Sequence, residues 1–169
     1  MPLNRFAFAC LLGLAVSASA RAETVTCPDL KTVVQVGSCP TEDELQYTYV
    51  GYCSEDSRAY RQETGVCVDY QDYRKLKNVA LWETGDGRFH AYVSCDTPAA
   101  TVRAAKPARL VVLAPRRGER MNRLTCDYAG GIQFTLRTHA ECRVSGDGVC
   151  AAGTGKSSGC EAICEATDK

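Results

Sequence analysis

The segment NRLTCDYAGGIQFTLRTHAECRV, residues 122–144, carries the strongest secondary-structure signal in the chain. Apolar residues dominate every second position from Leu124 to Tyr128 and again from Ile132 to Val144, on either side of Ala129-Gly130-Gly131. Period-two alternation is typical of a half-buried strand, and glycine tolerates the positive φ that a tight turn needs. The segment therefore predicts an antiparallel β-hairpin.

A second hairpin is predicted upstream, where strand-like runs at 78–83 and 89–95 flank Gly85-Asp86-Gly87. The turn length decides on which side of the sheet Trp82 lies. A three-residue turn places Trp82 opposite His90 on the polar face, whereas a two-residue turn places it in the core. A single tryptophan in a small domain is more often core, so the exposed position is the alternative.

Further short strands are predicted at 46–53, 65–68 and 109–114. Helix signals are scarce: Thr41 and Glu44 allow one short helical turn, and residues 160–166 allow a short helix. The predicted fold is all-β, a small antiparallel sandwich or barrel of six or seven strands. Residues 23–144 form this domain, and residues 145–169 form a Gly/Ser-rich tail that cysteines staple to it.

The first 22 residues have the features of a bacterial signal peptide. Arg5 supplies a positive charge, residues 6–16 are apolar, and Ala20-Arg21-Ala22 offers small residues at the positions that a signal peptidase reads. The apolar run is shorter than the ~20 residues that a membrane span needs. The chain is therefore expected to be periplasmic or secreted, without a membrane span.

Cysteine usage agrees with export. The chain has 11 Cys, and removing the leader removes Cys10, which leaves an even number. Cys160 and Cys164 alone have the close spacing of a zinc ligand pair, so up to five disulfides are expected in place of a metal site. No phosphate loop or metal motif is present, and no cofactor is expected. The ten predicted disulfide cysteines are Cys27, Cys39, Cys53, Cys67, Cys95, Cys126, Cys142, Cys150, Cys160 and Cys164.

Charge is balanced in sum, with 20 basic and 20 acidic side chains, but not along the chain. Residues 103–123 hold seven basic side chains against one acidic, a net +6, and residues 42–72 hold two against eight, a net −6. Exposed charges are often only solvated surface. The functional interpretation is a binding surface for a charged protein, formed by Arg116, Arg117 and Arg120 and by the tyrosines near the acidic segment: Tyr47, Tyr49 and Tyr52, with Trp82 if exposed.

Catalysis is the alternative. His90, His139 and Glu141 fall on polar strand positions, and with Arg137 they would suit acid–base cleavage of RNA. This set is unspecific, because polar residues on strands are usually plain surface. No Gly-x-Ser-x-Gly elbow is present.

The favoured hypothesis is an exported, disulfide-stabilised inhibitor or immunity-type protein that blocks another protein. A secreted effector or small hydrolase is the second hypothesis, and a structural envelope or adhesion component is the third. No nucleic-acid partner is expected, because no aromatic residue is interleaved among the arginines of residues 103–123.

Overall fold

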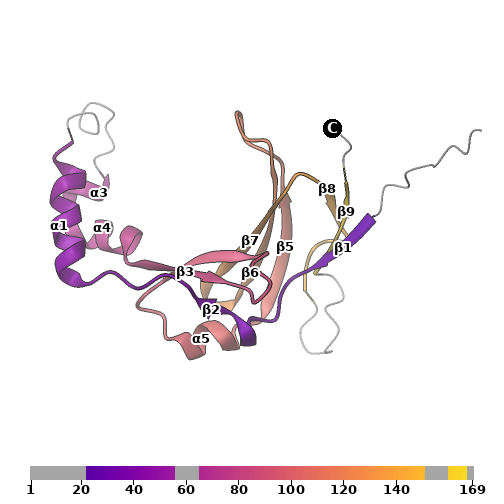
Figure 1. The fold of residues 1–169 in the computed structure, drawn as a ribbon, viewed down its shortest axis with the longest axis horizontal. Coiled ribbons are helices and arrows are strands. Elements are labelled where there is room, and N and C mark those ends of the chain that lie inside the picture. Colours follow the sequence, from indigo (N-terminus) through magenta and orange to yellow (C-terminus); the bar gives the residue numbers. More distant parts are fainter. Residues whose placement is uncertain (1–21, 56–64, 151–159, 167–169) are drawn as a thin grey trace, which may run out of the picture.

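Two antiparallel β-sheets make up most of the structure, and the helices within residues 42–77 gather at one end (Figure 1). The computed structural model describes residues 22–55, 65–150 and 160–166. The predicted leader, apart from Ala22, lies outside these residues, as does the 151–159 part of the predicted tail. The predicted antiparallel, disulfide-rich β class is confirmed, but the described residues form nine strands and not the six or seven predicted.

The larger sheet has six strands in the order β2-β3-β4-β7-β6-β5. They are β2 (Val34–Gln35), β3 (Val79–Glu83), β4 (His90–Ser94), β5 (Pro107–Leu113), β6 (Asn122–Tyr128) and β7 (Gln133–Thr138). One face carries buried side chains, and these join a cluster that includes Leu30 of η1 (Leu30–Thr32) and Val102 of α5 (Ala99–Ala104). The side chains on the other face of the sheet are half-buried or exposed.

The hairpin predicted at residues 122–144 is formed by β6 and β7, with Cys126 opposite Phe134, but it ends at Thr138. Residues 141–144 form a separate strand, which pairs in the smaller sheet. The turn is η2 (Ala129–Gly131), in which Gly130 and Gly131 have φ of 80° and 76°. Both values lie in the left-handed region that glycine adopts without strain. The Tyr128 hydroxyl donates a 2.7 Å hydrogen bond to the Pro28 carbonyl, which ties the hairpin to the N-terminal segment.

The second predicted hairpin is formed by β3 and β4, but neither predicted turn length is right. Thr84 bonds with Phe89, so the loop has four residues, 85–88. The Asp86 carboxylate holds it by accepting hydrogen bonds from the Thr84 hydroxyl and the Arg88 N–H. This register pairs Trp82 with Ala91 and leaves Trp82 only 4% exposed, so the exposed alternative for Trp82 is wrong and its core placement is right.

The smaller sheet has the order β1-β9-β8, with β1 (Ala22–Thr26), β8 (Glu141–Val144) and β9 (Glu161–Glu165). The helix predicted at 160–166 is therefore wrong. Ala162 and Cys164 are buried while their neighbours are half-buried, which is the alternation of a strand. Pairing on both sides, to β1 and to β8, decides the conformation of this short segment.

The strands predicted at 46–53 and 65–68 are helices: α1 (Glu42–Cys53) and α3 (Gly65–Val68), followed by α4 (Tyr70–Lys77). The capping box at Thr41 and Glu44 starts a helix of 12 residues and not the single turn predicted. Three acidic residues in the first turn of α1 stabilise the helix, because the positive end of the helix dipole lies at its N-terminus. Tyrosine contacts with α4 then outweigh the β propensity of residues 47–50.

All ten predicted disulfide cysteines are paired. Three bonds lie in or beside the two sheets and two hold the helical end of the molecule. The pairs are Cys27–Cys126, Cys39–Cys95, Cys53–Cys67, Cys142–Cys164 and Cys150–Cys160. Among the described residues, no helix is long and apolar enough to cross a membrane.

The disulfides are expected to differ in their contribution to stability. Cys27–Cys126 closes a sequence separation of 99 and Cys53–Cys67 one of 14. Restriction of the unfolded chain grows with loop length, and the intact Cys39–Cys95 bond shortens the loop that Cys27–Cys126 closes to roughly 43 residues. The Cys27→Ala/Cys126→Ala protein should therefore lose about 1 kcal/mol more unfolding free energy than the Cys53→Ala/Cys67→Ala protein. Urea unfolding followed by circular dichroism measures both. Equal losses for the two variants would contradict the expectation.

Candidate protein-binding surface

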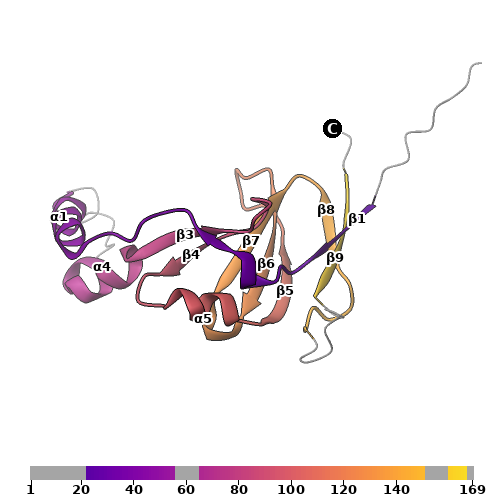
Figure 2. The same cartoon turned by 60° about the horizontal axis from the view of Figure 1, so that its bottom comes forward.

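Two projections rise from the same side of the six-stranded sheet (Figure 1). The first is the helical arm, which comprises α1, α3 and α4. The second is the arginine hairpin, the loop at residues 114–121 that joins β5 to β6. The arm lies at the opposite end of the molecule from the three-stranded sheet in both ribbon views (Figure 2).

The arginine hairpin is fully exposed but has a defined turn. Every residue from 114 to 121 is exposed, including Arg116, Arg117 and Arg120. The Glu119 N–H donates to the Arg116 carbonyl at 2.8 Å, and the Glu119 carboxylate accepts from the Arg116 N–H at 3.3 Å. Gly118 has a φ of 90°, which a turn of this kind requires at its third position. The loop therefore presents three guanidinium groups on an ordered backbone.

The strands β5 and β6 anchor the arginine hairpin to the core. β5 and β6 are paired from Leu113 opposite Arg123 down to Pro107 opposite Tyr128. Leu110 and Leu124, one from each strand, are buried in the main cluster. A tip held in this way loses little conformational freedom when it binds, because its base is already ordered.

Arg74 links the arm to the sheet beside a disulfide. The Arg74 guanidinium donates to both carboxylate oxygens of Asp96, at 2.8 and 3.1 Å, and its Nε donates to Glu42 at 3.3 Å. Asn78 also donates to Asp96, at 3.1 Å, beside the Cys39–Cys95 disulfide. The hydrogen bond from Arg74 lowers the pKa of Asp96. Hydrogen bonds from Tyr70 and then Arg74 lower the pKa of Glu42.

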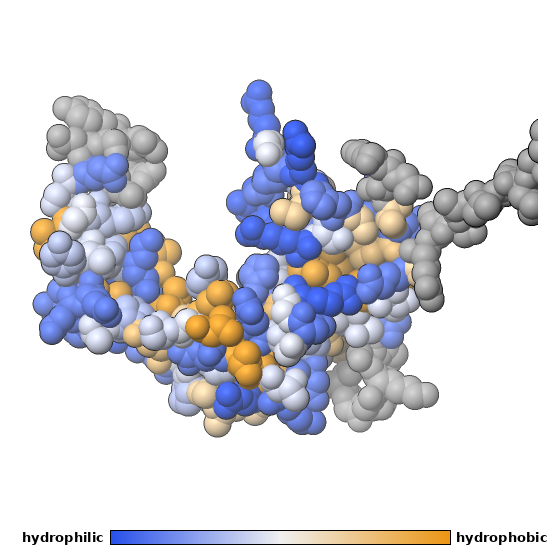
Figure 3. Space-filling view, viewed as in Figure 1, coloured by the Kyte–Doolittle hydropathy of each residue, from blue (hydrophilic) through white to orange (hydrophobic). Residues whose placement is uncertain are grey.

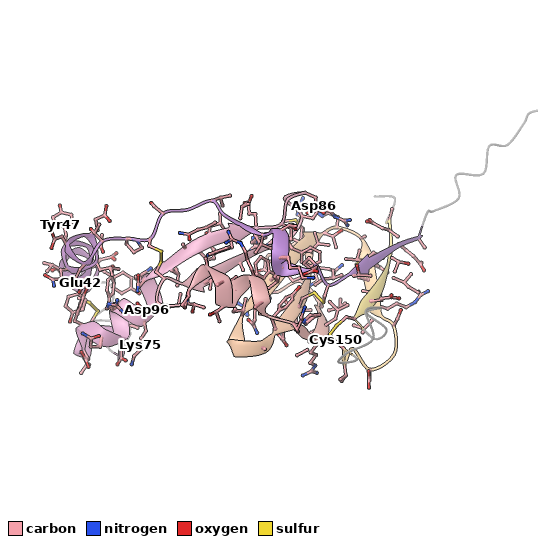
Figure 4. The ribbon with its side chains drawn as sticks, turned by 90° about the horizontal axis from the view of Figure 1, so that it is seen from below. Glu42, Tyr47, Lys75, Asp86, Asp96 and Cys150 are labelled. Atoms are coloured by element: carbon pink, nitrogen blue, oxygen red, sulfur yellow. A yellow bond between two sulfur atoms is a disulfide. The ribbon has the colours of Figure 1, made fainter. Side chains whose placement is uncertain are left out.

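The predicted binding tyrosines separate into two groups. Tyr49 packs edge-on against Tyr73, with ring centroids 5.2 Å apart, and donates to the Cys67 carbonyl at 3.1 Å. Tyr52 packs on Tyr73 at 5.4 Å, under the Lys77 ammonium. These contacts hold α1 on α4. Tyr47, in contrast, is 82% exposed at the outer edge of the arm (Figure 4).

An open groove of about 880 Å³ runs beside α1. It has Leu45 and Tyr73 among its buried lining residues and Tyr47 and Gly51 among its exposed ones. The sequence pattern does not reveal this groove, because residues 46–53 predict a strand with a different set of neighbours.

The space between the two projections is floored by the outer face of β2, β3 and β4. Tyr92 is 71% exposed there, and Val34 and Val36 are also exposed. Apolar surface gathers over β2 in Figure 3. The sequence pattern does not predict Tyr92, Val34 and Val36 as binding residues. It gives a signal for Tyr92 alone, which lies beside His90 on the polar face of the predicted strand.

The alternative catalytic residues lie on separate parts of the structure. His90 on β4 is opposite Glu83 on β3 and Thr135 on β7. Arg137 lies two residues after Thr135, on the same face of β7. His139 lies beyond the end of β7, with Nδ1 3.3 Å from the Arg120 carbonyl oxygen. Four residues of strand separate His139 from Thr135, roughly 13 Å. Glu141 pairs with Glu165 in the smaller sheet.

This arrangement does not supply the expected acid–base pair. General acid–base catalysis needs both groups within hydrogen-bond reach of one reacting bond. His90, His139 and Glu141 line neither the groove beside α1 nor a second groove, of about 420 Å³, between β1 and the turn at residues 84–89. The described residues contain no group of three or more His, Cys, Asp or Glu placed to hold a metal ion.

The Arg74 junction predicts how stability depends on pH. The Asp96 and Glu42 carboxyls have lower pKa values in the fold, so their contribution is present above the ordinary carboxyl pKa of about 4 and is lost as pH falls through the lowered values. Urea unfolding of the helices, followed at 222 nm, should show a fall in stability below about pH 4. The Arg74→Gln protein should be less stable at pH 7 and should lose part of that pH dependence. Lys75→Gln, on the same helix, is the control, and an unchanged pH slope in Arg74→Gln would contradict the interpretation.

Comparison with known proteins adds no relative to this description. No protein-family model matches the chain, and neither a curated protein nor a solved structure matches it.

Proposed function

We propose that the chain is an exported binding protein that blocks another protein by placing the arginine hairpin in an acidic cleft of that partner. The observation that carries this proposal is the hairpin itself: three exposed arginines on an ordered turn, at the end of a strand pair whose base is buried. Arginine is enriched among the residues that dominate protein–protein binding energy, and a preordered loop binds with a smaller entropy loss.

The surroundings of the hairpin support a protein partner. A stable interface buries about 800 Å² on each side, which is more than a loop tip alone supplies. The exposed Tyr92, Val34 and Val36 provide apolar surface between the hairpin and the arm, and Tyr47 provides more on the arm itself. Aromatic and apolar residues combined with arginine match the usual composition of an interface core.

Export is the second part of the proposal. The residues of the predicted leader and the five disulfides support it, because disulfides persist in oxidising compartments. One of these bonds, Cys27–Cys126, anchors β6, which is one of the two strands that carry the displayed loop. We place the protein in the periplasm or outside the cell.

Binding is expected to depend on two charges at the tip. The Arg116→Gln/Arg117→Gln protein should lose at least 10-fold in affinity for the partner, and the wild-type interaction should weaken steeply between 0.1 and 0.5 M salt, about the range over which screening of exposed charges becomes strong. The measurement is cross-linking of the mature protein in an extract of exported proteins, followed by titration of the identified partner and an assay of that partner's activity.

The matched control is Lys31→Gln/Arg143→Gln, which removes the same charge from exposed side chains elsewhere. It should bind like the wild type. If the two double variants bind the partner with equal affinity, the arginine hairpin does not contribute to the interface. A partner that keeps full activity when saturated would contradict the blocking function.

A further inference from the structure

Two arginines face each other at the base of the arginine hairpin. Arg123 on β6 is directly opposite Arg137 on β7. Their neighbours Leu124 and Leu136 are buried on the inner face, so both arginines lie on the outer face of the sheet. Like charges directly opposite each other on adjacent strands destabilise the pairing. The sheet nevertheless has this pair next to a loop that carries three more arginines.

The positive charge of this pair is poorly compensated within the chain. The Arg123 side chain is only 20% exposed, and its Nε is buried without a hydrogen bond to any described residue. The nearest carboxylate oxygen, Glu119 Oε2, is 4.0 Å away and already accepts from the Arg116 N–H. Arg137 makes no ion pair within the described ranges. Buried polar nitrogens are normally hydrogen-bonded, so the unpaired Nε of Arg123 points to a missing acceptor.

Other charged groups near the pair do not supply this acceptor. Asp127, on the same face of β6, is four residues from Arg123 and accepts from Gln133 at 2.9 Å. Glu83 is on β3, two strands away from β7, opposite His90. His139 contacts the Arg120 carbonyl oxygen, beyond the end of β7. Glu119 is thus the one carboxylate of the described residues that approaches Arg123 within ion-pair distance.

We infer that Arg123 and Arg137 form a binding site for an oxyanion, a carboxylate or a phosphate group. A guanidinium presents its N–H groups in a planar fork that matches two oxygens of such a group, and adjacent guanidiniums on one sheet face can share a single anion. Glu119 is a weak internal competitor, held by the turn of the hairpin just outside hydrogen-bond distance.

Two sources can provide this anion chemistry. One is an acidic side chain of the protein that the hairpin is proposed to bind, and that version rests on the proposed function. The other is a small anion free in solution. The site itself depends on neither, because it follows from the register of β6 and β7 and the unpaired Arg123 nitrogen.

The experiment follows the arginine Nε–H resonances of the mature protein by NMR, at constant ionic strength. Arg123 and Arg137 are assigned through Arg123→Lys and Arg137→Lys. Inorganic phosphate should produce a saturable shift of the Arg123 resonance with a millimolar Kd. Arg137→Gln should weaken this binding at least 5-fold, and Glu119→Gln should strengthen it at least 2-fold. Arg143→Gln, in the smaller sheet, should leave it unchanged.

A hexaglutamate peptide distinguishes the two sources. Binding at least 10-fold tighter than phosphate supports a site for the carboxylates of an acidic protein, whereas weaker binding supports a site for a small anion. No saturable shift with either probe, or a shift that persists unchanged in Arg137→Gln, would overturn the inference. Phosphate is titrated without a protein partner, so this result tests the anion site even where the proposed function fails. Absence of phosphate binding likewise leaves the test of the proposed function unaffected.

Discussion

The pairing of β6 with β7 is the constraint on which the rest of the structure depends. One register places Leu124 and Cys126 opposite Leu136 and Phe134 in the core, and Cys126 then reaches Cys27. The same register places Arg123 opposite Arg137 on the outer face. Because side chains alternate with a period of two, a slip of one residue in either strand would turn the arginine of that strand into the core and its buried side chains to the outer face. Stability and the charged outer face therefore arise from one hydrogen-bond pattern.

Disulfides compensate for sparse packing in the elements that bury few large side chains. In the described part of the arm, Leu45 and Tyr73 are the buried large side chains, which is little for two helices without a second layer. Cys53–Cys67 closes the arm, while Cys39–Cys95 and the Arg74–Asp96 ion pair attach it to the sheet. Cys142–Cys164 likewise joins β8 and β9 in the smaller sheet. These cross-links hold projecting elements that hydrophobic burial alone would support weakly.

What the sequence reveals depends on how local the deciding interaction is. The β6–β7 hairpin is predictable because its alternation and its glycines lie within one segment. The strand β9 is not, since its partners β1 and β8 include a segment more than 130 residues away. The position of Trp82 depends on a loop held by the Asp86 carboxylate, a contact that composition does not show. The arginines of the hairpin are visible as a charge run, whereas the Arg123–Arg137 pair requires knowledge of the register.

The two projections carry opposite net charge, and this bears on the proposed function. Over the described residues 42–55 and 65–77 the arm holds six acidic and three basic side chains, a net −3, while the loop at 114–121 holds three basic and one acidic, a net +2. An acidic partner is attracted to the hairpin and repelled by the arm, so it approaches in one orientation. The apolar floor of β2, β3 and β4 lies between the two charges. In the proposed function, charge orients the encounter with the partner, and the apolar floor supplies the area that affinity requires.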